Sequence, residues 1–107
     1  MDFKYIQQIA TELSLNVKYV NNVEQLHIEG STIPFISRYR KEATGNMDEV
    51  QVADVINKIK YFDELIKRKE TVLKTIEAAG KLMPELQQRI EDTISSTELE
   101  DIYLVAP

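Results

Sequence analysis

Residues 48–79 read DEVQVADVINKIKYFDELIKRKETVLKTIEAA, and they contain neither glycine nor proline. Asp48 and Gln51 have the spacing of a capping box, in which each side chain bonds the backbone N–H of the other residue. Apolar side chains then recur every three or four positions, as they do along one face of an α-helix. The stretch therefore predicts one long helix with a stripe of Val52, Val55, Ile59, Phe62, Ile66, Lys69, Leu73 and Ile76.

The residues before this stretch predict three short helices. Asn16 is placed to cap the second helix, and Ser31 or Thr32 to cap the third. Gly30 ends the second helix, and the turn at residues 44–46 ends the third. Helical spacing assigns three sets of apolar side chains to the core: Phe3, Ile6, Ile9, Ala10 and Leu13; then Val17, Val20, Val23 and Leu26; then Phe35, Ile36 and Tyr39.

The residues after Gly80 predict two further short helices. One begins at Pro84 and presents Leu86, Ile90 and Ile94. The other follows a capping box at Thr97 and Glu100 and presents Leu99, Ile102 and Tyr103. No segment alternates with a period of two, so we expect an all-α fold, with short helix-turn-helix-like N-terminal helices packed on one long central helix and two short C-terminal helices.

The long apolar stripe has two uses, packing within its own chain or pairing with another copy. It lacks the regular flanking charge pattern of a coiled coil, and the short helices need a surface on which to bury their faces. Lys69 also interrupts the stripe with a charge. We therefore expect a monomer that forms a single domain over residues 1–107.

The amino-acid composition excludes several classes of function. The chain has no cysteine and one histidine, His27, so cysteine-ligated zinc, thiol chemistry and a histidine-rich metal site are excluded. No phosphate loop or nucleophile motif is present, and the adjacent carboxylates point about 100° apart on a helix. We expect no catalytic residues, no metal site and no cofactor. The lack of a long apolar run or a leader predicts a cytoplasmic protein without a membrane span.

The net charge of −5 is unevenly distributed. Residues 84–107 carry six acidic residues and one basic residue, whereas Arg38, Arg40 and Lys41 cluster around Tyr39. This cluster is the candidate nucleic-acid-binding site, because cations contact phosphates and an aromatic ring stacks on a base. The simpler alternative is the solvated face of a small helix over residues 32–42, on which Arg38 and Lys41 share one side and Tyr39 points inward.

Residues 32–51, TIPFISRYRKEATGNMDEVQ, closely resemble the signature near the start of the Tex family of transcription accessory proteins. Two later stretches are similar to the same N-terminal region: GKL at residues 80–82 with PEL at 84–86, and TELEDIYL at 97–104. The resemblance covers essentially the whole chain. One departure is Met83, which stands where the family often has a threonine that caps the following helix.

The resemblance implies a multidomain bacterial protein, related to a eukaryotic transcription elongation factor, of which this chain is a fragment. Downstream domains in that family include a ribonuclease-H-like domain, helix-hairpin-helix modules and an OB-fold RNA-binding domain. The implied role is a non-enzymatic N-terminal scaffold that supports RNA or DNA binding. Its partners would be those domains, nucleic acid bound weakly by this fragment, and RNA polymerase.

Two functions of other classes remain open at the sequence level. The first is a free-standing helical interaction or oligomerisation module that uses the stripe of residues 52–76. The second is a small helix-turn-helix DNA binder with residues 32–42 as its recognition helix, although the acidic balance of the chain counts against it.

Overall fold

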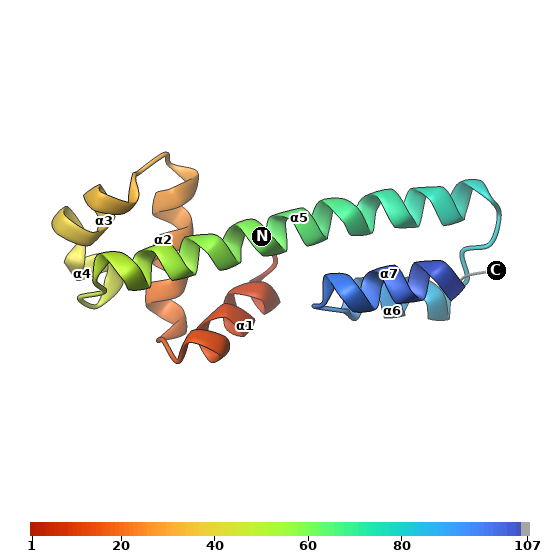
Figure 1. Cartoon of the computed structure of the whole chain (residues 1–107), viewed down its shortest axis with the longest axis horizontal. Helices are drawn as coiled ribbons and strands as arrows, with labels where there is room; N and C mark the ends of the chain where they lie inside the picture. Colours follow the sequence, from red (N-terminus) through yellow and green to blue (C-terminus); the bar gives the residue numbers. More distant parts are fainter. Residues whose placement is uncertain (106–107) are drawn as a thin grey trace. The chain divides into compact units, whose positions relative to one another are not determined.

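The computed structural model describes residues 1–105, so the last two residues of the predicted 1–107 domain lie outside the described residues. Residues 1–105 form seven helices and no strand, which confirms the all-α prediction (Figure 1). The helices are α1 (Phe3–Leu13), α2 (Val17–Ile28), α3 (Ile33–Tyr39), α4 (Lys41–Thr44), α5 (Glu49–Ala78), α6 (Pro84–Asp92) and α7 (Ser96–Val105).

The chain divides into two compact units, unit 1 over Met1–Tyr61 and unit 2 over Phe62–Pro107, and α5 contributes to both. In unit 1, α1 to α4 pack with the first part of α5. The apolar core of this unit consists of Tyr5, Ile6, Ile9, Ala10, Val20, Val23, Leu26, Ile36, Met47, Val52, Val55, Ile56 and Ile59. The predicted apolar faces of α1 and α2 are thus largely confirmed, whereas three residues assigned to the core, Phe3, Phe35 and Tyr39, are exposed.

Local hydrogen bonds set the helix ends in unit 1. The side chain of Asn16 accepts from the Lys18 N–H at 2.8 Å. The predicted capping box also forms: the Asp48 N–H donates to Gln51 Oε1 at 3.0 Å, and the Gln51 N–H donates to Asp48 Oδ1 at 2.8 Å. These bonds satisfy backbone N–H groups that have no partner within the helix, which is why the caps can be found from the sequence.

In unit 2, α6 and α7 pack with the second part of α5. The buried side chains on α5 are Phe62, Leu65, Val72 and Ile76, and the two short helices add Ile90, Leu99 and Ile102. The sequence assigned Ile66 and Leu73 to this stripe instead. Ile66 and Leu73 are half-buried. Each is adjacent in sequence to the residue that is buried in its place, Leu65 or Val72, so the predicted stripe is shifted by one position at these two points.

Polar side chains also connect the elements of unit 2. Lys69 is only 6% exposed, and its Nζ donates to the Glu91 carbonyl oxygen at 2.8 Å. Glu91 lies in the last turn of α6, where carbonyl groups lack helical partners and attract a cation. Arg68 donates two hydrogen bonds to the Glu100 carboxylate, at 3.0 and 2.7 Å.

Two predicted features of unit 2 are wrong. α7 begins at Ser96, and the Ser95 Oγ accepts from the Glu98 N–H at 3.2 Å, so the capping residue is Ser95 and not Thr97. Ile94 lies beyond the end of α6 and is exposed. The expectation about Met83 is confirmed, since it occupies the N-cap of α6 without a side-chain hydrogen bond. None of the helices in residues 1–105 has the length and hydrophobicity that a bilayer crossing requires.

Candidate nucleic-acid interface

The three predicted site residues lie at the junction of α3 and α4, here called the basic turn (residues 38–42). α3 ends at Tyr39, Arg40 has φ −126° and ψ 40°, and α4 begins at Lys41. The predicted helix over residues 32–42 is therefore wrong, and Arg38 and Lys41 do not share the face of one helix. The three cations remain neighbours in the chain, but they are presented by two helices and the residue between them.

Hydrogen bonds and buried side chains hold α3 and α4 against the rest of unit 1, so the position of the basic turn is fixed within this unit. The Thr32 Oγ1 accepts from the Phe35 N–H at 3.3 Å at the start of α3, and Ile36 is fully buried. The amide of Asn22 on α2 donates to the Ala43 carbonyl on α4 at 2.8 Å.

The turn that follows α4 also fixes the position of this helix. Thr44 is buried, and its Oγ1 accepts from the Met47 N–H at 3.2 Å. Gly45 has a φ of +64°, and a Cβ at this position would lie 2.5 Å from a ring carbon of Tyr19. Positive φ and this close approach both require glycine, so the end of α4 is tightly specified.

The charges of the basic turn are not equivalent. Arg40 Nε lies 2.7 Å from Glu42 Oε1, and the hydrogen bond from Arg40 lowers the pKa of the Glu42 carboxyl. Arg38 and Lys41 are exposed and form no ion pair with a carboxylate of residues 1–105. Two of the three predicted cations are therefore available to an anion, while Arg40 already has Glu42 as its partner.

Two aromatic rings lie beside these cations. Phe35 is 43% exposed and Tyr39 is 70% exposed, with ring centroids 5.6 Å apart and ring planes inclined by 46°. The prediction that both rings point into the core is wrong, since of the three predicted core residues Phe35, Ile36 and Tyr39 only Ile36 is buried. The surface of α3 thus combines exposed aromatic faces with unpaired positive charge.

Nothing in the sequence marks the break at Arg40, because residues 38–43 contain no glycine or proline. In the part of the chain that the structure describes, no cluster of three or more histidine, aspartate and glutamate side chains is arranged to hold a metal ion.

The fold and the basic turn define the class of the protein: an all-helical domain in which short helices pack on one long helix. Comparison with known proteins identifies the family, because the model of the Tex-like protein N-terminal domain matches residues 3–77. The chain belongs to the Tex family, which confirms the resemblance seen in residues 32–51.

Full-length relatives are similar over nearly all of this chain. The transcriptional accessory protein Tex of Neisseria gonorrhoeae is 44% identical over 96 residues, which are 90% of this chain and 13% of that protein. Protein YhgF of Escherichia coli is 40% identical over 104 residues, 97% of this chain and 14% of that protein. The uncharacterized protein YdcI of Bacillus subtilis is 44% identical over 97 residues, which are 91% of this chain and 14% of that protein. The chain thus spans about a seventh of the length of these relatives.

Proposed function

We propose that this domain is a non-enzymatic scaffold of a Tex-like transcription accessory factor, and that its basic turn contacts the phosphates of RNA or DNA. The observation that carries the proposal is the pair of exposed, unpaired cations, Arg38 and Lys41, beside the exposed ring of Tyr39. Lysine and arginine bind phosphates, and an aromatic ring offers a stacking surface to an unpaired base. The name of the N. gonorrhoeae relative describes that protein as a transcriptional accessory protein.

The scaffold role is supported by the use of buried polar groups. The Ser37 hydroxyl donates to the Pro34 carbonyl at 3.2 Å, the Thr44 hydroxyl accepts from Met47, and Lys69 donates to Glu91. The bond of Ser37 lies within α3, the bond of Thr44 holds the end of α4, and the bond of Lys69 joins α5 to α6. Buried polar groups at a reaction centre would instead be directed at a substrate.

The binding by this chain should be weak and indifferent to sequence. Two cations that neutralise phosphates give a log–log salt slope of about −1.8, at about −0.9 for each phosphate of a duplex. Phosphate contacts carry no direct sequence information. The six acidic residues within residues 84–107 add negative charge that disfavours a polyanion.

The same proposal includes the remaining partners of the domain. It works in the cytoplasm as a monomeric unit, joined to the further domains of a longer Tex-like protein and near RNA polymerase. The monomer is supported by the burial of Val52, Val55 and Ile59 of the α5 stripe within their own chain, where they are unavailable to a second copy.

A salt titration of binding tests the proposal. Single-stranded RNA, single-stranded DNA and duplex DNA are titrated with this chain and with its Arg38→Ala/Lys41→Ala variant. The variant should lose most of the salt dependence, whereas Lys60→Ala/Lys67→Ala, which removes two exposed cations of α5, should change it little. Binding that is unchanged in the first variant would contradict the assignment, and tight sequence-selective binding would favour helix-turn-helix recognition.

Glu42→Gln provides a gain-of-function control. The substitution removes the carboxylate that pairs with Arg40 and so releases a third cation. The salt slope should steepen from about −1.8 to about −2.7. The same change in the Arg40→Ala background should have no such effect, because no cation remains to be released.

A further inference from the structure

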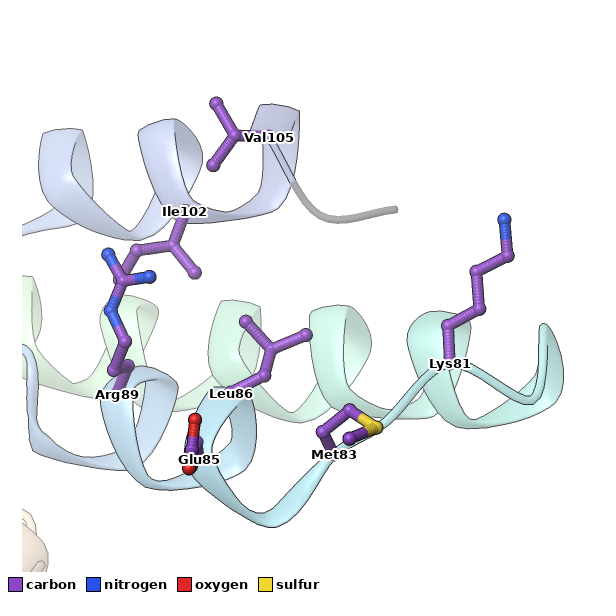
Figure 2. Close-up of a pocket in the computed structure, with 7 residues that line it drawn as sticks. All are labelled: Lys81, Met83, Glu85, Leu86, Arg89, Ile102 and Val105. Carbon is purple, nitrogen blue, oxygen red and sulfur yellow. The ribbon is translucent and has the colours of Figure 1, made fainter.

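A groove in unit 2 lies between α6, α7 and the connection that precedes α6 (Figure 2). Its volume is about 260 Å³. Leu86 and Ile102 face the same space from the two helices, and Met83 and Val105 border it. Met83 is 64% exposed and Val105 is 75% exposed. The groove therefore presents apolar surface that the described chain leaves open to solvent.

Two cations flank this apolar centre. Figure 2 shows Arg89 and Lys81 on opposite sides of Leu86. Neither forms an ion pair with a carboxylate of the described residues. Glu85 also lines the groove and offsets one charge. Arg89 is the one basic residue within residues 84–107, and it lines the groove together with Lys81, which lies just before this acidic region.

The size and chemistry of the groove identify what fits it. A volume of about 260 Å³ is below the range of roughly 300–1,000 Å³ that is usual for small-molecule sites. It suits instead a single large side chain, such as the anchor by which a peptide enters a partner. Unpaired cations on both sides favour carboxylates before and after that anchor, since complementary charge increases both association rate and specificity.

We propose that this groove binds an acidic amphipathic segment of a partner protein. One leucine or aromatic side chain of that segment packs against Met83, Leu86 and Val105, and flanking carboxylates pair with Lys81 and Arg89. The site lies in unit 2 and uses none of the residues of the basic turn.

Fluorescence anisotropy with designed peptides tests the proposal on the whole chain. The probe is a labelled peptide with a central leucine pair and glutamates on both sides. Two matched peptides replace the glutamates with lysines or the leucines with serines. The acidic leucine peptide should bind best, its affinity should fall with salt because the ion pairs are exposed, and the other two peptides should bind at least about tenfold more weakly.

Charge reversal at the rim makes the test specific. Lys81→Glu/Arg89→Glu should weaken binding of the acidic peptide about tenfold and should strengthen binding of the lysine peptide. Lys74→Glu, at an exposed cation of α5 that does not line the groove, should change neither affinity. Met83→Ser removes exposed apolar surface without opening the core and should weaken binding of the acidic leucine peptide. Circular dichroism confirms that each variant is folded.

Three results would overturn the proposal. The first is equal affinity for the acidic and the lysine peptides. The second is binding that does not respond to reversal of Lys81 and Arg89. The third is a dimer of the chain that is lost on Arg89→Glu while the acidic peptide does not bind, since the occupant would then be a second copy.

Discussion

In unit 1 the short helices meet mainly through apolar side chains and backbone caps, with one exposed ion pair from Lys58 of α5 to Glu12 of α1 at 3.1 Å. In unit 2 two cations of α5 join both short helices to the long one. Lys69 reaches the last turn of α6, and Arg68 reaches Glu100 of α7. Unit 1 also has cations at the surface of the basic turn, where Arg38 and Lys41 have no carboxylate partner among residues 1–105. Cations that cross-link elements stabilise a fold, and cations left unpaired are available to a ligand.

The apolar core of unit 2 should give the largest effect. Phe62→Ala is expected to lower the free energy of unfolding by about 3–5 kcal/mol, because the ring is 2% exposed and its loss leaves a cavity. Tyr61→Ala, at the exposed neighbouring position, is the matched control and should cost about 1 kcal/mol or less. Urea denaturation measures both. A loss below about 1 kcal/mol for Phe62→Ala would show that this core is wrongly assigned.

The buried ammonium of Lys69 should have the next largest effect. Lys69→Met preserves most of the apolar packing but removes the donor to the Glu91 carbonyl, and a buried acceptor without a partner costs about 1–3 kcal/mol. The exposed Lys67→Met should stay within about 0.5 kcal/mol of the parent. If Lys69→Met is as stable as the parent, α6 is held by apolar contacts alone and the contrast between the units disappears.

The Arg68–Glu100 pair should give the smallest effect and one that depends on pH. Hydrogen bonds from Arg68 lower the pKa of the Glu100 carboxyl in the folded state. A carboxyl with a lowered folded pKa adds stability above its unfolded pKa, and this stability is lost as the pH falls through the folded pKa.

The expected result is a difference in melting temperature between the parent and Glu100→Gln that is largest above about pH 5 and shrinks toward about pH 3. Arg68→Gln should remove the same pH-dependent part. A difference that does not change between these pH values would show that the pair does not form in solution.

The sequence predicts the local features of this fold well. The Asp48–Gln51 capping box and the Asn16 cap each depend on residues within three positions of one another. The phase of the α5 stripe is harder to predict, because Leu65 and Ile66, and likewise Val72 and Leu73, are adjacent and equally apolar. Only the packing of α6 and α7 decides which residue of each pair is buried.

The sequence predicts which residues form the candidate site, but it does not predict how they are arranged. Arg38, Arg40 and Lys41 are found from their clustering, whereas the helix break at Arg40 and its pairing with Glu42 depend on how α4 is held by Asn22. The exposure of Phe35 and Tyr39 was missed because apolar residues at helical spacing are usually buried. Arg68 and Glu100 are 32 positions apart, and no local pattern links them.

The most direct test of the central claim is an NMR titration of the ¹⁵N-labelled chain with a short single-stranded RNA at low salt. We expect amide shift changes centred on residues 35–42, with the largest at Arg38, Tyr39 and Lys41, and little change in residues 84–105. Shift changes confined to residues 84–105, or changes at the basic turn that survive Arg38→Ala/Lys41→Ala, would contradict it.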